Sequence, residues 1–158
     1  MKQASHAAHS PVEVLAPSQI KTSGVVQVRV RYCECDPMAV AHHASYAPWL
    51  EIGRTELLRD CGVSYAALER AGVFLVIVKL EVRYRRPVRY DDLVEVRTKW
   101  IGGSRIKIEH EYEVVVVERH GERADQVAAA ASTTLACVDA AGKVRELPEW
   151  LAGERAGS

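Results

Sequence analysis

Hydrophobic and polar residues alternate strictly in segment 26–32, where Val26, Val28, Val30 and Tyr32 fall on one face. A period of two residues is typical of a strand with one buried face, so this segment is predicted to be a strand. Four later segments have strand-forming patterns and are predicted to be strands connected in order by hairpins: 73–87, 92–101, 105–117 and 124–139.

The hydrophobic period changes after the first strand. From Tyr46 to Cys61 apolar residues recur at helical spacing, which predicts a helix about 25 Å long. Ser45 is expected to cap its first turn with its side chain, and Gly62 to end it. Gly53, in mid-helix, indicates close approach of a neighbouring backbone. Shorter helical segments are predicted at 64–72 and 147–151.

This order of elements predicts an α+β domain in which one helix covers one face of a single antiparallel sheet. Such a sheet has open edges, which proteins usually pair or cover. We therefore expect a homodimer or homotetramer that joins sheets edge to edge. The domain is expected to span 25–148, between a flexible N-terminal tail, 1–24, and a short C-terminal tail, 149–158.

Composition narrows the classes of partner. The 158 residues include 21 Lys and Arg and 21 Asp and Glu, whereas a nucleic-acid-binding domain is usually strongly basic. No apolar run approaches the roughly 20 residues of a membrane span, and the N-terminus lacks the apolar core of a signal peptide. We expect a cytoplasmic protein that binds no nucleic acid, does not span a membrane and keeps its four cysteines reduced.

The segment CECDPMAVAHHASY, residues 33–46, concentrates the candidate chemistry and has three interpretations. Zinc would draw on Cys33, Cys35, Asp36, His42 and His43, but their spacing fits structural zinc sites poorly, so no metal is expected. Alternatively, Asp36 and Pro37 form an ordinary turn at the end of a strand.

The third interpretation is catalytic. An acid just before a helix faces backbone N–H groups that lack helical partners, and these can stabilise negative charge developing on a carbonyl oxygen. A carboxylate beside them can act as nucleophile or as general base on water. These two features suffice for a reactive substrate such as a thioester.

The segment 29–62 resembles the signature of the hotdog-fold acyl-CoA thioesterases of the 4-hydroxybenzoyl-CoA thioesterase type. The matching residues are Tyr32, Glu34, Cys35, Asp36, Val40, His43, Tyr46, Trp49, Glu51 and Arg54. The similarity extends over about 25–148. It implies a hotdog fold, in which a five-stranded antiparallel sheet wraps one long central helix and subunits associate through sheet pairing.

The resemblance also implies roles. Asp36 matches the catalytic aspartate, and His43 matches the residue whose backbone N–H polarises the thioester carbonyl. Met38 and Ala39 fill a loop that commonly contains glycine, and are expected to shape the acyl pocket. The full set of expected substrate-binding residues is Met38, Ala39, Val40, His42, Ser45, Tyr46, Arg86, Ser104 and Arg105.

Coenzyme A is an anion, and the candidate basic residues for its phosphates are Arg85, Arg86, Lys99, Arg105 and Lys107. The alternative, which is favoured for any single one of them, is a solvated strand face. It belongs to the substrate, so no separate cofactor is expected. The resemblance implies hydrolysis of an acyl-CoA with a short-to-medium aliphatic or an aromatic acyl group. A hotdog hydratase or dehydratase, and a non-catalytic module that binds acyl thioesters or acyl carrier protein, remain alternatives.

Two other positions have a structural and a functional interpretation. Glu51 is expected to form an ion pair with Arg54 on the helix face, although some hotdog branches place a catalytic carboxylate on this helix. His110, on an apolar strand face, is expected to be a hydrogen-bonded histidine of the core or of an interface.

Overall fold

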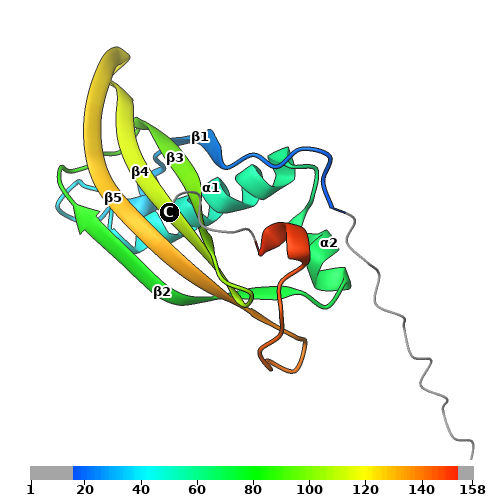
Figure 1. Ribbon diagram of the computed structural model, residues 1–158. Helices are drawn as coiled ribbons and strands as arrows, with labels where there is room; N and C mark the ends of the chain where they lie inside the picture. Colours follow the sequence, from blue (N-terminus) through cyan, green and yellow to red (C-terminus); the bar gives the residue numbers. More distant parts are fainter. Residues whose placement is uncertain (1–15, 153–158) are drawn as a thin grey trace, which may run out of the picture.

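The computed structural model describes residues 16–152 and contains the five predicted strands and the long helix (Figure 1). The strands are β1 (Ser23–Arg29), β2 (Phe74–Tyr84), β3 (Leu93–Gly103), β4 (Lys107–Arg119) and β5 (Glu122–Val138). The helices are α1 (Tyr46–Asp60) and α2 (Tyr65–Arg70), with three 3-10 turns, η1 (Tyr32–Glu34), η2 (His43–Ser45) and η3 (Glu149–Leu151). No helix within 16–152 has both the length and the apolarity needed to cross a membrane.

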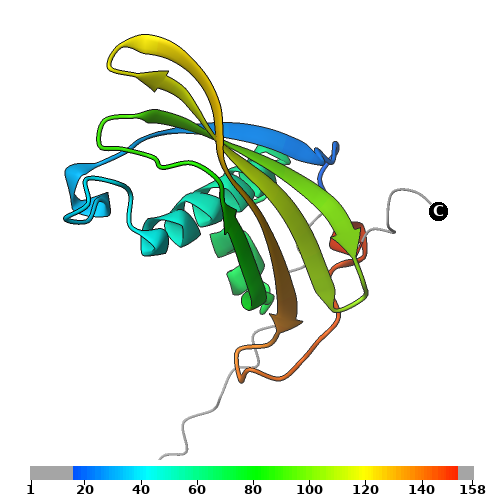
Figure 2. The same cartoon turned by 90° about the vertical axis from the view of Figure 1, so that its left-hand side faces the viewer.

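All strands belong to one antiparallel sheet with the order β1-β3-β4-β5-β2, which curves around α1 (Figure 2). The prediction that hairpins join the last four strands in order is wrong for β2, which pairs with β5 and not with β3. The chain between β2 and β3 is held at the end of the sheet instead, where Val88 O accepts a hydrogen bond from Ala41 N at 2.7 Å. Asp92, in the same connection, is buried and forms an ion pair with Arg119 of β4.

The helix α1 buries Trp49 and Leu50 against valines of the sheet, among them Val94 and Val96. Gly53 is the point of closest approach, because a Cβ atom there would lie 2.5 Å from Thr98 Oγ1 and 2.9 Å from Val96 Cγ1. The glycine therefore accommodates side chains of β3, and not a neighbouring backbone as predicted. Gly62 follows the helix with φ of 88°, which confirms the predicted C-terminal stop.

Several predicted boundaries need correction. Tyr32, predicted to lie on the buried strand face, belongs to η1 and is 81% exposed, because the chain turns at Arg31. β1 begins at Ser23, two residues before the predicted domain start. Leu151 of η3 is buried in the core, so residues 149–152 pack against the domain and are not a tail. Of the other predicted tail residues, 16–22 precede β1 in the described part of the chain, and 1–15 and 153–158 lie outside it.

Candidate active site at the start of the long helix

Residues 34–42 form a tight hairpin that leads into α1. His42 N donates to Glu34 O at 2.8 Å, and Asp36 N donates to Val40 O at 3.0 Å. At the tip, Ala39 has φ of 63°, a left-handed conformation that glycine adopts at least cost. This conformation gives a physical reason for the glycine that related loops commonly contain.

Asp36 stabilises this hairpin with its own side chain. Its Oδ1 accepts a hydrogen bond from Met38 N at 2.8 Å, which is the turn expected of an Asp-Pro sequence. Its Oδ2 accepts from no group in residues 16–152. The turn and the catalytic interpretations are therefore compatible, since one oxygen shapes the loop while the other is available to a substrate or a water molecule.

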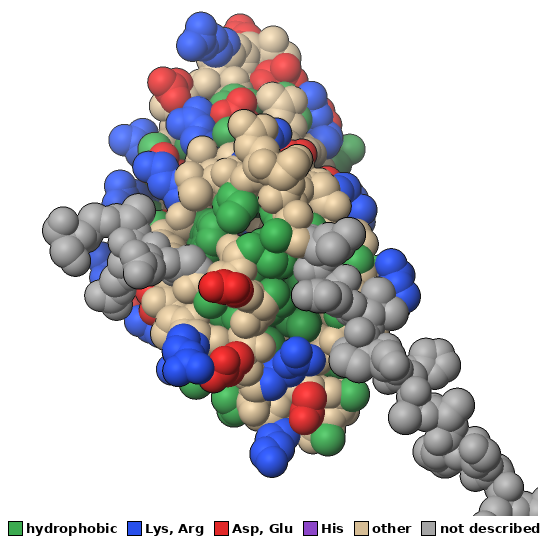
Figure 3. All heavy atoms as spheres, turned by 45° about the vertical axis from the view of Figure 1, so that its right-hand side comes forward, with side chains coloured by type: hydrophobic (Ala, Val, Ile, Leu, Met, Phe, Trp, Pro, Cys, Tyr) green, Lys and Arg blue, Asp and Glu red, His purple; other side chains and the backbone are tan. Residues whose placement is uncertain are grey.

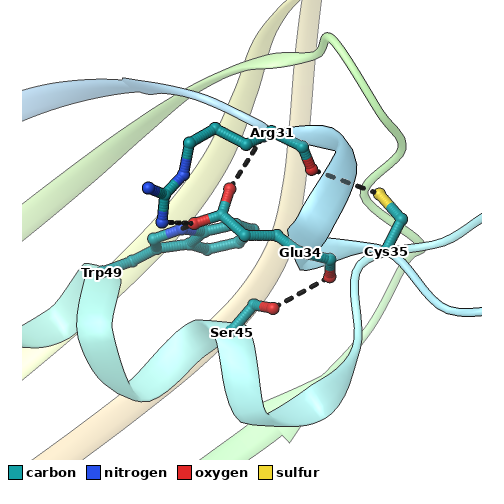
Figure 4. A network of polar contacts seen from close by, with 5 residues as sticks. All are labelled: Arg31, Glu34, Cys35, Ser45 and Trp49. Atoms are coloured by element: carbon teal, nitrogen blue, oxygen red, sulfur yellow. Dashed lines mark hydrogen bonds and ion pairs between the residues drawn. The ribbon is translucent and has the colours of Figure 1, made fainter.

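Glu34 joins the hairpin to the helix (Figure 4). Its side chain is buried; Oε1 accepts from Trp49 Nε1 at 3.0 Å and from Arg31 Nη2 at 2.9 Å, and Oε2 accepts from Arg31 N at 2.8 Å. Burial alone would raise the pKa of this carboxyl, but these hydrogen bonds lower it below its ordinary value. The ionised carboxylate thus ties the end of β1 to the first turn of α1.

The start of the helix differs from the prediction. Ser45 is itself helical and its hydroxyl donates to Glu34 O at 2.9 Å, so the predicted side-chain cap is wrong. The cap lies one turn earlier because η2 runs directly into α1: His42 Nδ1 accepts from Ala44 N at 3.1 Å. The N–H of His43, the first residue of η2, donates to no group in the described chain. This free donor belongs to an exposed residue at the start of a helix, where the backbone dipoles favour negative charge.

Two tyrosines flank this donor. Tyr84, at the end of β2, donates from its hydroxyl to His43 O at 3.3 Å and packs edge-on against Tyr46, with ring centroids 4.9 Å apart. Burial, with a smaller effect of Tyr84, raises the pKa of Tyr46 to about 12, so Tyr46 is neutral at physiological pH. Sequence reasoning missed Tyr84, because only the sheet order places the end of β2 beside η2.

The structure brings most of the predicted site residues together at this end of the sheet. The hairpin and the following turn carry Asp36, Met38, Ala39, Val40, His42, His43, Ser45 and Tyr46. Arg86 lies two residues before Val88, which bonds to Ala41, and its own N donates to Ala128 O of β5 at 3.1 Å. Ser104 and Arg105 lie in the turn after β3, at the opposite end of an 11-residue strand, about 35 Å away. Arg105 forms an ion pair there with Glu146.

The cysteines were considered above as possible metal ligands. All four cysteines are free, and residues 16–152 contain no group of three or more His, Cys, Asp or Glu side chains placed to hold a metal ion. Burial, and then the nearby carboxylates of Glu34 and Asp36, raise the pKa of the Cys35 thiol. The thiolate form needed for nucleophilic attack is therefore disfavoured at Cys35.

Away from the hairpin, the predicted pair between Glu51 and Arg54 is confirmed, with Oε2 and Nη2 3.3 Å apart. His110 is buried as predicted, but its Nδ1 has no hydrogen-bond partner among the described residues, so the expectation that it is satisfied is wrong. Burial, with a smaller contribution from the charge of Arg54, lowers the pKa of His110 to about 4.

Replacing Glu34 with Ala is expected to lower the free energy of unfolding by about 2–3 kcal/mol, because Trp49 Nε1 and Arg31 N lose their acceptor. Urea denaturation measures this change. Glu56→Ala is the matched control, since Glu56 makes only a surface ion pair with Arg59 and should change stability by less than about 0.5 kcal/mol. Equal effects of the two substitutions would contradict the structural role of Glu34.

The pKa of His110 predicts a pH dependence of stability. Between pH 6.5 and about 4 the unfolded state binds a proton that the folded state does not, so stability falls as the pH falls through this window. The full difference corresponds to about 3 kcal/mol. Urea denaturation at several pH values should show a shallower fall in His110→Gln than in wild type. His120→Gln, at an exposed turn, should keep the wild-type dependence of the unfolding free energy on pH. If His110→Gln also keeps it, His110 is not the cause of the pH dependence.

Comparison with known proteins shows which families and structures the chain is similar to. Residues 30–154 match the thioesterase-like superfamily. The acyl-CoA thioester hydrolase YbgC of Escherichia coli is 42% identical over 72 residues, which cover 46% of this chain and 54% of YbgC. This chain therefore spans only about half the length of that relative.

Solved structures extend the likeness to the whole fold. A DHNA-CoA thioesterase from Staphylococcus aureus is 30% identical with a TM-score of 0.71, covering 79% of this chain and 80% of the other. A variant of 4-hydroxybenzoyl-CoA thioesterase solved with 4-hydroxybenzoyl-CoA has a TM-score of 0.72 at 18% identity, covering 82% and 95%. At that identity it supports the fold alone. The predicted hotdog fold and family are confirmed. The chain belongs to the thioesterase-like superfamily.

Proposed function

We propose that this protein hydrolyses acyl-CoA thioesters, with Asp36 and the backbone N–H of His43 as its reacting groups. The observation that carries the proposal is their placement in one hairpin. Asp36 has one oxygen without a partner among residues 16–152, and the return arm of the hairpin leads directly to the unpaired N–H of His43. Named acyl-CoA thioester hydrolases among the relatives support the same reaction.

The proposed reaction needs only these groups and water. The N–H of His43 donates to the thioester carbonyl oxygen and stabilises the negative charge that forms on it. Asp36 either removes a proton from the attacking water or attacks the carbonyl carbon itself, forming an anhydride that water then opens. In both routes the C–S bond breaks, and CoA leaves as a thiolate and takes up a proton. No cofactor is required.

Substrate contacts follow from the same geometry. Met38 is 81% exposed at the tip of the hairpin, and Ala39 holds the left-handed turn, so both are placed to limit the size of the acyl group. The rings of His42 and His43 lie with their centroids 3.9 Å apart and are tilted by 34°, and both residues are exposed, so both are candidate substrate contacts. Arg85 and Arg86 are exposed basic residues of the predicted set in the connection whose Val88 bonds to the hairpin, and are candidates for the CoA phosphates.

We further propose that the protein is a homo-oligomer, a dimer or tetramer, that pairs through β2. This strand lies at one edge of the sheet, and its Val76, Ile77, Val78 and Leu80 are each more than 40% exposed. An open edge with exposed apolar side chains is unfavourable in an isolated chain. A second copy would also be needed for Ser104 and Arg105 to contact a substrate, because they lie far from the hairpin of their own chain.

The proposed location is the cytoplasm. Four free cysteines are typical of a reducing compartment, and acyl-CoA substrates are anions that need no membrane span to be bound.

Asp36→Asn is expected to reduce thiol release from acyl-CoA by at least about 100-fold while the fold is kept. Asn can still accept the hydrogen bond from Met38 N, so the hairpin should stay intact. The assay uses acyl groups from acetyl to palmitoyl, with benzoyl and hydroxybenzoyl. Asp91→Asn is the matched control, since Asp91 is exposed with φ of 65°, a conformation that Asn tolerates.

An active Asp36→Asn enzyme would overturn the proposed role of Asp36. A wild type that hydrates crotonyl-CoA without releasing thiol would identify a hydratase. Acyl-CoA binding without any turnover would identify a binding module.

Val78→Lys is expected to lower the mass measured by light scattering to that of one chain, 17.5 kDa, because an added charge opposes pairing of the β2 edges. The control is Val144→Lys, at a position that is also exposed but lies outside the sheet strands, and it should keep the mass of the wild type. A wild type that is itself monomeric would refute the proposed association.

A further inference from the structure

A pocket lies away from the hairpin, between the C-terminal half of α1, the sheet, α2 and η3. Its volume is about 40 Å³. Most of its walls are apolar, and include Leu57, Leu58, Leu75, Ile108, Leu135 and Leu151. None of the residues assigned above to the candidate active site lines it. Arg54, which does, follows His43 by eleven residues, or about 16 Å along a helix.

Polar groups in the walls of this pocket have no partners. Within residues 16–152, the buried atoms Arg54 Nε and Nη1, His110 Nδ1 and Trp150 Nε1 make no hydrogen bond. Arg54 and His110 are 7% and 6% exposed, so water outside the protein does not satisfy them. Within the described residues Arg54 forms one ion pair, from Nη2 to the exposed carboxylate of Glu51 at 3.3 Å. It also lies near the hydroxyls of Tyr65 and Tyr112, whose pKa values are raised by burial, an effect that Arg54 opposes. Buried polar groups are nearly always paired in folded proteins, so such a cluster calls for an explanation.

The chemistry of these groups defines the missing partner. Arginine and tryptophan nitrogens only donate hydrogen bonds, and the histidine nitrogen donates in one of its two neutral forms. The pocket therefore offers donors, one of which carries a buried positive charge. Such a set is complementary to an anion that accepts hydrogen bonds, and the planar guanidinium matches a carboxylate best.

We propose that this pocket binds the carboxylate of a small organic acid with an apolar body. The carboxylate would accept from Arg54 and Trp150, with His110 as a further donor, and the hydrocarbon would lie against the surrounding leucines. The apolar walls favour such a ligand over a hydrated inorganic anion, since burying hydrocarbon is favourable and stripping water from an ion is not.

The size and position of the pocket fit this ligand. A water molecule needs about 10–15 Å³ of such volume, so about 40 Å³ admits a carboxylate group and the first carbon of its chain, and the remaining hydrocarbon would extend to the opening. Ile20 and Lys21 also line the pocket and are exposed, which places the opening beside an apolar and a positive side chain. Figure 3 brings the side with α2 and η3 forward, and hydrophobic side chains gather at the centre of that face.

Titration of the full chain with sodium hexanoate tests the proposal, with 1-hexanol as the uncharged control. The chain has three tryptophans, whose indole N–H signals can be followed by NMR. Trp150 reports on the pocket, while Trp49, bonded to Glu34, reports on the candidate active site. Hexanoate should shift the Trp150 signal to saturation below about 10 mM and leave the Trp49 signal in place. Hexanol should bind at least about tenfold more weakly.

Two variants identify the groups involved. Arg54→Lys keeps the charge but loses the fork, and should weaken binding about tenfold, whereas Arg59→Lys, exposed on the same helix, should not. If Arg54→Lys does not fold, calorimetry on Trp150→Phe replaces it, and hexanoate affinity should fall about threefold through the loss of one donor.

The proposal is overturned if hexanoate does not bind, if hexanol binds equally well, if only Trp49 responds, or if the variant that folds keeps wild-type affinity. The test uses no thioester, and Asp36→Asn should bind hexanoate as the wild type does. Failure of the proposed hydrolysis and failure of this proposal can therefore be told apart.

Discussion

The candidate site depends on one buried carboxylate. Glu34 accepts hydrogen bonds from Trp49 on α1 and from both the side chain and the backbone of Arg31, while its own carbonyl oxygen accepts from His42 and Ser45. A buried carboxylate is stable only when such partners surround it. The strand end, the hairpin and the first turn of the helix are therefore held in one arrangement, and the free N–H of His43 and the free oxygen of Asp36 are products of that arrangement.

The chemistry proposed for this end of the molecule uses backbone geometry more than side chains. The group that would polarise the substrate is the N–H of the first residue of the turn η2, and Tyr84 donates to the carbonyl oxygen of the same residue. At the tip, the side chains of Met38 and Ala39 form no hydrogen bond with the buried carboxylate or with this N–H. Such an arrangement lets the acyl pocket vary while the reacting groups stay in place.

Glu34 and Arg54 are both buried, but they differ in how many of their polar atoms have hydrogen-bond partners. Both oxygens of the Glu34 side chain accept hydrogen bonds, so the burial of this carboxylate is accounted for by its role in holding the fold together. Two of the three guanidinium nitrogens of Arg54 have no acceptor in the described chain, and the residue lines an apolar pocket together with His110 and Trp150. A satisfied buried charge serves the fold, whereas an unsatisfied one beside a cavity indicates a place for a ligand.

The sequence by itself determined the elements and the chemical character of the hairpin. Alternation in segments such as 92–101 and helical spacing from Tyr46 to Cys61 are local patterns, and the motif around Asp36 resembles that of the family to which the chain belongs. Tertiary structure decided the strand order, the role of Ser45, the separation of Arg105 from the hairpin, and the unpaired nitrogen of His110. Each of these depends on which distant group a residue meets, and the hydrophobic period specifies only which face of an element is buried, not the partner that covers it.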